Sequence, residues 1–569
     1  MLLSENFVPL ACTVPGGPQH YCEGTAQVWI PVLRQAPGVR RYFGKRFQTY
    51  IKEKMKKNLF ILIAFISTYF LTATNSKAQT FNPNLATMLQ DTLNTYFTAF
   101  NNIKGMTAGV YLPGQGYWQG KAGESFTGQA IMQDMEFGIA SNSKLFVATI
   151  MLKLAEDNII HLDDSLHTWL PNYVNIDPNI TIRQLLNHKS GISDPIFISP
   201  WMDTFMAHPS RVFTPVEVLS WVGAPYFPKG TSWGYSNVNY ILAAMIAKNA
   251  TGFHISKLIR DSILIPLNLD STFYDVEESV IGTLAHRWWN AGSGPVTDYN
   301  GVSRVGLNTA GGAAGSLFSN SSEMLQWYHA LFSSQILNTS SMAELKNFVP
   351  TTNPSQQYSF GLLRETTQGL TYWGHGGDTW GYKSKMIYDS SMGAVVCALS
   401  NSFPNGMTSI PFLLYRAIKN HVPASAGIIV GPTTVVQGQT NVTYTITPIA
   451  NVTTYVWTLP NGATGTSNSN SITVNYTGSA LSGNITVSGS NNFGVGNVST
   501  LAITVNSNTT PGNVGINVIT PQRNLHVKDV IRLEPRNQPP DNPVEGDMYF
   551  DGVLKKLRVF DGTIWQNCW

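Results

Sequence analysis

Charged side chains and cysteines are both scarce in this chain. Only 12% of the 569 residues are Asp, Glu, Lys or Arg, and so low a share argues against a disordered tail or a coiled coil. The four cysteines form no C-x-x-C pair and no H-E-x-x-H motif is present, so neither a zinc site nor a disulfide framework is indicated. The 49 glycines show no three-residue period, which excludes collagen. We therefore expect no metal and no other cofactor.

The net charge of +3 is carried by the N-terminus. Residues 1–78 contain ten Lys and Arg against three Asp and Glu, whereas residues 79–569 contain 26 against 30, a net charge of −4. A nucleic-acid-binding protein needs a basic surface, so that class of partner is excluded. The length exceeds what one compact core supports, and two or more domains are expected.

A secretory signal peptide is predicted at residues 55–78. Two lysines after Met55 precede the apolar run 59–71, and Ser76-Lys-Ala78 supplies small residues at a cleavage site. The run falls short of the roughly 20 apolar residues of a membrane-spanning helix, and its basic flank favours export over a buried core helix. Because export signals belong at the N-terminus, we expect residues 1–54 to be a gene-start artefact. The mature protein is then periplasmic or extracellular.

Composition divides the C-terminal part of the chain. Residues 420–522 contain no Asp, Glu, Lys or Arg, and their alternating β-branched segments predict strands. Tyr455-Val-Trp457 resembles the central Trp strand of an immunoglobulin-like or PKD-like sandwich. We place the sandwich at residues 424–506 and a small β-rich module, reminiscent of bacterial surface proteins, at residues 513–569. Short linkers are expected before each of them, at residues 423–427 and 507–513.

Residues 84–422 predict an α+β fold. Two early strands, at residues 106–111 and 117–120, precede a series of helical segments. Strands return over residues 383–400, before a final helix at residues 410–420. Strands and helices that are segregated in this way are typical of an antiparallel sheet flanked by helices.

The most informative motif is Ser141-x-x-Lys144. The following segment, Leu145 to Leu154, is apolar nearly all round, which predicts a buried helix with Ser141 at its N-cap or in its first turn. Lys144 then lies on the same helical face as Ser141. Burial lowers the pKa of a lysine, and a neutral amine can take a serine proton. The alternative is a capping serine with a snorkelling lysine, but no other S-x-x-K occurs in the chain.

Two further short motifs could complete a site. Tyr235-x-Asn237 precedes a predicted helix, and a tyrosine beside a lysine can share a proton transfer. His375-Gly376-Gly377-Asp378 precedes a predicted strand, and its glycines allow a close approach of backbone N–H groups to a substrate. Each motif alone is equally well explained as a turn, and a second Y-x-N at residues 173–175 is expected in a loop.

The ordered set of Ser141-x-x-Lys144, Tyr235-x-Asn237 and His375-x-Gly377 resembles the superfamily of penicillin-binding proteins and serine β-lactamases. The nearest branch holds class C β-lactamases, D-alanyl-D-alanine carboxypeptidases and related esterases. The resemblance covers residues 84–422 and implies a β-lactamase-like fold with a helical subdomain. It also implies that Ser141 is the acylated nucleophile, that Lys144 and Tyr235 transfer protons, that Asn237 orients them, and that backbone N–H groups of Ser141 and Asp378 form the oxyanion hole.

The third motif departs from the Lys-Thr-Gly of many relatives. His375 replaces the lysine, and Gly376 removes the hydroxyl group that helps to hold a substrate carboxylate. An unperturbed histidine titrates near pH ~6.5, so His375 is expected to be only partly cationic at neutral pH, and the motif argues less for a carboxylate-binding site than Lys-Thr-Gly does. A G-x-S-x-G match at residues 230–234 would make Ser232 a rival nucleophile. Pro228-Lys before it predicts a turn instead of the strand that such an elbow requires.

The sequence therefore predicts an exported serine hydrolase. Its substrates would be D-amino-acid peptides of the peptidoglycan kind, β-lactams or small esters. The alternative is a cell-surface binding or adhesion protein with a vestigial hydrolase domain, because the C-terminal modules offer a route to surface association. The simultaneous presence of Ser141, Lys144 and Tyr235 favours the enzyme.

Overall fold

The computed structural model describes residues 80–100, 102–196, 198–290, 294–507, 514–516, 525–527 and 530–568. The predicted signal peptide and the segment before it lie outside the described residues, as does nearly all of the second predicted linker. No helix in the described ranges is long and apolar enough to cross a membrane.

A large antiparallel sheet organises residues 80–422. Its strands are β1 (Gly105–Leu112), β2 (Gly116–Phe126), β3 (Gln129–Ala130), β9 (Val349–Pro350), β10 (Gln356–Tyr358), β11 (Leu363–Thr367), β12 (Leu370–Gly374), β13 (Gly376–Thr379), β14 (Tyr382–Asp389) and β15 (Ala394–Ser400). The order is β3-β2-β1-β15-β14-β12-β11-β10-β9, and β13 pairs with β14. Every residue of β15 is buried, because helices cover both faces of the sheet.

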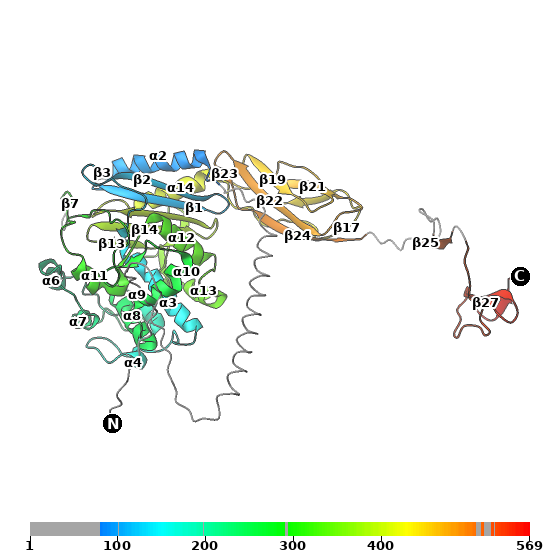
Figure 1. The fold of residues 1–569 in the computed structure, drawn as a ribbon, viewed down its shortest axis with the longest axis horizontal. Coiled ribbons are helices and arrows are strands. Elements are labelled where there is room, and N and C mark those ends of the chain that lie inside the picture. The colour runs from blue at the N-terminus through cyan, green and yellow to red at the C-terminus, as the bar shows by residue number, and fades with distance from the viewer. Residues whose placement is uncertain are drawn as a thin grey trace, which may run out of the picture. The chain divides into compact units, whose positions relative to one another are not determined.

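Two helices, α2 (Pro83–Ala99) and α14 (Ser409–His421), cover one face of the sheet (Figure 1). Asn82 starts α2 by accepting a hydrogen bond from the backbone of Leu85, and Pro83 fits the first turn because its missing N–H is not needed there. Apolar residues four positions apart on both helices are buried in a shared core with β1 and β15; they are Leu85, Leu89, Leu93, Ile410, Leu414 and Ile418.

The opposite face carries α12 (Ser321–Phe332) and the helical part of the fold. Its two longest helices are α3 (Ser143–Glu156) and α8 (Val238–Thr251), and both are buried over most of their surface. The shorter elements are α4 (Leu166–Trp169), α5 (Ile182–Leu186), α6 (Trp201–Ala207), α7 (Pro215–Leu219), α9 (Ile255–Ile259), α10 (Ile265–Leu267), α11 (Val305–Gly311) and α13 (Thr339–Leu345), with the single turns η1 (Ala140–Asn142), η2 (Arg260–Leu264) and η3 (Gly312–Ala314).

Two small sheets connect the helical part to the large sheet. One has the order β4 (Phe137–Gly138), β8 (Leu317–Ser319), β5 (Phe273–Tyr274), and the other has the order β16 (Ser402–Phe403), β6 (Trp288–Trp289), β7 (Thr297–Asp298). The first of them fixes β4 directly before η1, which carries Ser141. The α+β prediction is therefore confirmed, although the hairpins of β10, β11 and β12 were not predicted, because these strands are only three to five residues long.

The charge-free stretch forms a β-sandwich, as predicted. One sheet has the order β17 (Thr434–Val436), β24 (Ser499–Asn506), β22 (Gly483–Asn491), β19 (Thr454–Thr458), with β23 (Gly494–Val495) beside β22; the other has the order β18 (Val442–Thr445), β21 (Ser471–Tyr476), β20 (Ala463–Thr464). The inward residues of β21 alternate with exposed ones and enter a core around Tyr444 and Tyr476. The terminal module has β27 (Met548–Asp551) and β28 (Lys556–Phe560), as expected, and also β29 (Trp565–Asn567). The strands β25 (Val514–Ile516) and β26 (Leu525–Val527) form a parallel pair.

The expected linker at residues 423–427 is held in place by hydrogen bonds. The backbone N–H of Ala424 donates to the carbonyl of Ala450, and that of Ala426 donates to Asn497. The Asn491 side chain donates to the carbonyl of His421, and the ring of Phe493 lies 5.1 Å from that of His421. The end of α14 is thus joined to the sandwich by specific contacts.

Candidate active site

Ser141 lies in a tight turn that leads into the buried helix α3. Ala140, directly before it, has a φ of +47°, a value that few residues with a side chain adopt, so the backbone is strained at this point. The helix begins at Ser143, and its N-cap residue is Asn142. The expectation that Ser141 lies at the N-cap or in the first turn of α3 is therefore wrong, because Ser141 belongs to the 3₁₀ turn η1 that precedes the helix. The hydroxyl group of Ser141 contacts side chains from other elements instead.

Lys144 lies in the first turn of α3 and has no exposed surface. Its Nζ lies 3.0 Å from Ser141 Oγ, 2.7 Å from Asn237 Oδ1 and 2.7 Å from the carbonyl oxygen of Ala314. Burial lowers the pKa of Lys144 to about 7, and the negative charge of Asp194 offsets part of that effect. A substantial fraction of this lysine is therefore neutral at physiological pH.

Tyr235 contacts the same serine. Its hydroxyl group donates a hydrogen bond of 2.9 Å to Ser141 Oγ, and its ring lies 4.9 Å from Lys144 Nζ. Burial raises the pKa of Tyr235 far above its ordinary value, the charges of Asp194 and Asp378 raise it further, and the hydrogen bond to Ser141 opposes them. The phenol thus keeps its proton at neutral pH.

Asn237 connects Lys144 to a carboxylate that the sequence analysis missed. Asn237 is the N-cap residue of α8, and both its backbone N–H and its Nδ2 donate to one oxygen of Asp194, over 2.9 Å and 2.8 Å. These bonds fix the amide so that its oxygen faces Lys144. Nothing in the local sequence pattern around Asp194 pointed to the site.

His188 is a second residue to which the sequence analysis assigned no role. It has no exposed surface, and its Nδ1 accepts hydrogen bonds from the Ser236 backbone and the Asn239 side chain. The His188 ring lies 4.4 Å from that of Tyr235. Burial, together with the charge of Lys144, lowers the pKa of His188 well below its ordinary value. The ring is therefore neutral and packs against Tyr235.

The third motif lies against the turn that holds Ser141. Strand β13 contains Gly376, Gly377 and Asp378 and pairs with β14. A Cβ atom on Gly377 would lie 2.3 Å from the carbonyl oxygen of Ile139 and 3.0 Å from the N atom of Ser141, so glycine is required there. At Gly376 the nearest atoms would be 3.8 Å away, and a side chain fits. The Asp378 carboxylate is about half exposed and lies 3.4 Å from Lys383.

The partial positive charge expected of His375 at neutral pH is not what the structure shows. The side chain is 4% exposed, and burial, followed by the charge of Lys144, lowers its pKa to about 3. Its Nδ1 bonds to the carbonyl oxygen of Gly376, and its Nε2 lies 3.2 Å from the hydroxyl group of Tyr358. His375 is thus neutral at pH 7 and has no N–H left to hold a carboxylate. The burial of the His375 side chain, which cannot be deduced from the motif, accounts for the difference between the expected charge and the neutral ring.

A cleft of about 600 Å³ opens beside Ser141. Its apolar wall is formed by Met202, Trp289, Leu363, Trp380 and Phe403, and its charged residues are Glu365, Asp378 and Lys385. Lys385 is tied to Glu365 by an ion pair of 2.5 Å. Burial alone would raise the pKa of Glu365, but the charge and hydrogen bond of Lys385 lower it overall. Glu365 is therefore ionised at neutral pH and paired with Lys385, while Asp378 is paired with Lys383 and about half exposed.

The competing motifs lie away from this cleft. Ser232 is exposed and follows Gly230, whose φ of +80° belongs to a turn, and no strand precedes it. The predicted turn is thus present, and the structure offers no nucleophile elbow. The second Y-x-N, at residues 173–175, lies in a loop, as expected. Within the described residues, no group of His, Cys, Asp and Glu side chains is arranged to hold a metal ion.

Comparison with known families agrees with this geometry. The sequence profile of the β-lactamase family matches residues 93–412, and that of the PKD-like domain matches residues 422–503. The first match covers more than half of the chain and includes the cluster around Ser141. The chain therefore belongs to the β-lactamase family, which places it among the serine hydrolases, and a PKD-like domain follows. The predicted resemblance is confirmed.

Curated relatives match over shorter stretches. Penicillin-binding protein 4* of Bacillus subtilis is 34% identical over 139 residues, which are 24% of this chain and 30% of that protein. Protein flp of Staphylococcus aureus is 32% identical over 143 residues, 24% of this chain and 28% of that protein. The chain thus spans less than a third of the length of these relatives. The unguisins hydrolase ungD' of Aspergillus campestris is 23% identical over 374 residues, 61% of this chain and 67% of that protein.

Solved structures share the fold of the hydrolase part. A D-stereospecific amidohydrolase from Streptomyces sp. aligns with a TM-score of 0.52 and 27% identity, over 58% of this chain and 97% of that protein. The D-amino acid amidase of Ochrobactrum anthropi, complexed with L-phenylalanine amide, aligns with a TM-score of 0.53 and 25% identity, over 59% of this chain and 99% of that protein.

Proposed function

We propose that this protein is an exported serine hydrolase that forms an acyl-enzyme on Ser141 and cleaves amides of apolar D-amino acids. The position of Ser141 Oγ carries the proposal, since it lies within hydrogen-bond distance of both Lys144 Nζ and Tyr235 OH. A nucleophile flanked by two proton-transfer groups is the arrangement that acyl transfer requires. Export is supported by the signal-like segment at residues 55–78.

Lys144 is the proposed acylation base. A neutral amine has two N–H groups and one lone pair, and Asn237 Oδ1 and the Ala314 carbonyl are placed to accept the two N–H groups. The lone pair is then directed at Ser141 Oγ. As Ser141 attacks the substrate carbonyl carbon, its proton moves to Lys144, and the backbone N–H groups of Ser141 and Asp378 are the proposed donors to the oxyanion.

Tyr235 is the proposed acid for the leaving group. Its raised pKa keeps the phenol protonated, so it can give its proton to the departing nitrogen as the C–N bond breaks. The ammonium group of Lys144, whose Nζ lies near the tyrosine ring, restores that proton. Water then attacks the ester on Ser141, which releases the acid and regenerates the serine.

The charges of the cleft support a substrate with a free α-ammonium group. The Asp378 carboxylate, although paired with Lys383, is about half exposed in the lining of the cleft with Ser141 and can accept a hydrogen bond from an ammonium group. The apolar wall with Trp289 and Trp380 suits a large apolar side chain. Neutral His375 does not favour a substrate carboxylate. Likeness to the D-stereospecific amidohydrolase supports the D configuration.

The C-terminal modules support a further proposal, that the enzyme is held at the cell surface. The sandwich has no Asp, Glu, Lys or Arg and is covered with hydroxyl and amide side chains. Such a surface suits contact with uncharged carbohydrate or with other surface proteins rather than with ions.

β-Lactams and small esters are alternative substrates of the same acylation step, because both present a carbonyl carbon to Ser141.

The test combines intact mass with substrate comparison. Incubation with a fluorophosphonate should add one adduct to Ser141, and a penicillin should show whether a β-lactam acylates the same residue. Release of ammonia from D-phenylalanine amide should exceed that from L-phenylalanine amide and the release of D-alanine from an acylated D-alanyl-D-alanine peptide. A preference for the acylated dipeptide would overturn the ammonium-directed specificity, and absence of any adduct would overturn the serine hydrolase itself.

A further inference from the structure

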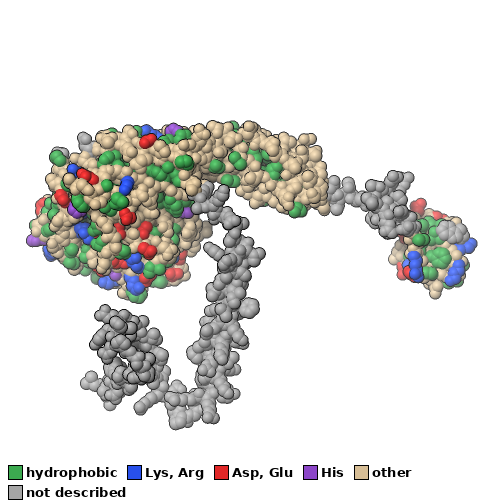
Figure 2. Space-filling model, turned by 45° about the horizontal axis from the view of Figure 1, so that its top comes forward, with side chains coloured by type: hydrophobic (Ala, Val, Ile, Leu, Met, Phe, Trp, Pro, Cys, Tyr) green, Lys and Arg blue, Asp and Glu red, His purple; other side chains and the backbone are tan. Residues whose placement is uncertain are grey.

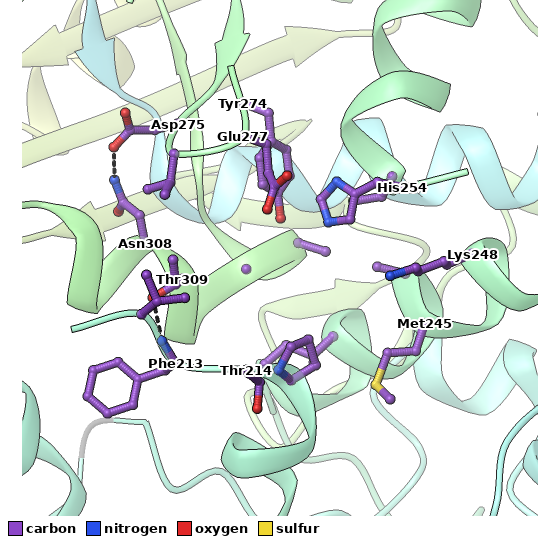
Figure 3. Close-up of a pocket in the computed structure, with 18 residues that line it drawn as sticks. Phe213, Thr214, Met245, Lys248, His254, Tyr274, Asp275, Glu277, Asn308 and Thr309 are labelled. Atoms are coloured by element: carbon purple, nitrogen blue, oxygen red, sulfur yellow. Dashed lines mark hydrogen bonds between the residues drawn. The ribbon is translucent and has the colours of Figure 1, made fainter. Parts of the chain in front are cut away.

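A second cavity of about 280 Å³ lies between α8, α11 and the turn after β5 (Figure 3). Its apolar interior includes Ile241, Ala244 and Met245 on one face of α8, with Phe213 and Ala313 opposite. A cavity of about 150 Å³ holds benzene, so this one accommodates roughly a dozen non-hydrogen atoms. It is separate from the cleft beside Ser141 and takes no part in the acylation chemistry.

The rim of this cavity carries opposite charges. Lys248 and Glu277 both line it, and both act electrostatically on His254, which lies at the same rim. Figure 3 shows Lys248, His254 and Glu277 bordering one side of the opening. Within the described part of the chain, neither Lys248 nor Glu277 forms an ion pair, whereas Asp275, deeper in the wall, is already paired with Arg304. One cation and one anion at the rim are therefore available to a ligand.

We infer that this cavity binds a free apolar α-amino acid, whose ammonium group meets Glu277, whose carboxylate meets Lys248 and whose side chain enters the apolar interior. A zwitterion of about this size matches one cation and one anion over an apolar pocket, whereas a simple anion or cation would leave one rim charge unmatched. The choice of ligand rests on the proposed function, because hydrolysis of an amino-acid amide releases such a molecule.

Two walls of the cavity continue directly to Lys144. The N-cap residue of α8, Asn237, accepts a hydrogen bond from Lys144 through its side chain, and the helix presents Ile241 and Met245 to the cavity one and two turns later. Gly312 and Ala313 of η3 form part of the opposite wall, and the next carbonyl, that of Ala314, accepts another hydrogen bond from Lys144. Asn308 lines this cavity and also a smaller pocket beside Ser141. A ligand that shifts η3 or α8 would therefore disturb the orientation of Lys144 and lower kcat.

The experiment uses the full chain after its cleft has been blocked with a fluorophosphonate. Titration calorimetry with D-phenylalanine should still show one binding site per chain. Lys248→Met and Glu277→Gln, both at exposed positions, should each weaken binding about tenfold, because each removes a charge-assisted contact. Ala244→Phe should abolish binding by filling the cavity. The matched control is Lys257→Met, since Lys257 is exposed on α9, pairs with Asp261 and does not line the cavity.

The outcomes separate this inference from the proposed function. Absence of binding to the blocked protein, or binding that Lys248→Met and Glu277→Gln leave unchanged, overturns the cavity assignment even if D-phenylalanine amide is hydrolysed. Binding that depends on these residues in a protein that hydrolyses no amide upholds the site and overturns the proposed reaction. In the active enzyme, D-phenylalanine should lower kcat in the parent chain and in Lys257→Met, but not in Ala244→Phe. If the fluorophosphonate does not react, the same variants are titrated in the unblocked chain.

Discussion

The hydrolase part and the sandwich differ in the polar groups that they bury. Figure 2 shows charged side chains scattered over the hydrolase part and nearly absent from the sandwich. The former buries Lys144 and Glu136 completely, and burial shifts the pKa of each to about 7. The latter satisfies its interior with hydroxyl groups, such as the 2.7 Å bond between Tyr444 and Tyr476. The hydrolase part thus contains buried acidic and basic side chains, whose burial costs stability, and the sandwich has none.

The largest expected effect on activity comes from substitutions of Ser141 and Lys144 in the hydrolase part. Ser141→Ala should abolish the fluorophosphonate adduct, and Lys144→Ala should lower kcat/KM by about 10⁴ while the serine remains present. The two changes together should cost little more than either alone, because the residues act as a unit. Ser232→Ala is the control and should leave labelling intact. Loss of the adduct in Ser232→Ala alone would contradict the assignment of the nucleophile.

Adjacent glycines in β13 offer a matched pair. Gly377→Ala should lower kcat about a hundredfold, because the new methyl group would displace the strand from Ile139 and disturb the donors to the oxyanion. Gly376→Ala has space for its methyl group and should retain activity within about threefold. Steady-state kinetics with one neutral ester would decide the matter, and equal losses in both variants would show that the contact with Ile139 is not the cause.

The pH profile should report Lys144. Because its pKa is lowered to about 7 by burial, kcat/KM should rise with pH through that value as the amine loses its proton. The Asp194 charge raises the pKa of Lys144, so Asp194→Asn should move the acidic limb of the profile to lower pH. The substitution should also reduce kcat/KM about tenfold, because Asn237 is no longer held by the Asp194 carboxylate. The ratio of kcat/KM for an anionic and a neutral substrate should stay flat between pH 5.5 and 8, since His375 remains neutral. If the acidic limb of the kcat/KM profile did not move in Asp194→Asn, the charge of Asp194 would not influence the pKa of Lys144.

Stability should depend on pH mainly through the hydrolase part. Burial, followed by the charges of Glu323 and Asp134, raises the pKa of Glu136 to about 7, against a backbone hydrogen bond from Gly282. Above about pH 4.5 the unfolded chain loses this proton while the folded chain keeps it, so stability falls until about pH 7. Glu136→Gln removes that loss and should raise the free energy of unfolding by about 1–3 kcal/mol at pH 8, with little gain at pH 4. Denaturant titrations at both pH values provide the measurement.

The smallest effect is expected from removing the charge-free part. A chain ending at His421 should retain kcat/KM within about twofold, because no residue of the sandwich lines the cleft. Its melting temperature should fall by a few degrees, since the contacts of Asn491 and Phe493 with the end of α14 are lost. Thermal unfolding and kinetics of the two chains would test this. A large loss of activity would show that the sandwich supports the site.

The sequence was informative where the chemistry is local. Ser141 and Lys144 are three residues apart on one helix, so their proximity follows from the pattern, and the long apolar run after them indicated burial. The roles of Asp194 and His188 were missed because their contacts with Asn237 and Tyr235 span more than 40 residues. The charge of His375 was misjudged for a related reason, since its pKa depends on burial and on Lys144. In the fold, β15 was evident as an apolar strand, whereas the short hairpins of β10 to β12 were not.

The absence of charge over residues 420–522 has a consequence for proteolysis. Proteases that cut after lysine or arginine find no site between Lys419 and Arg523, and those that cut after acidic residues find none over the same stretch. Even when unfolded, the PKD-like domain should therefore survive tryptic digestion as one peptide, residues 420–523. We propose that this domain is exposed outside the cell. Its resistance to proteases that cut after charged residues follows from its composition and does not depend on its fold.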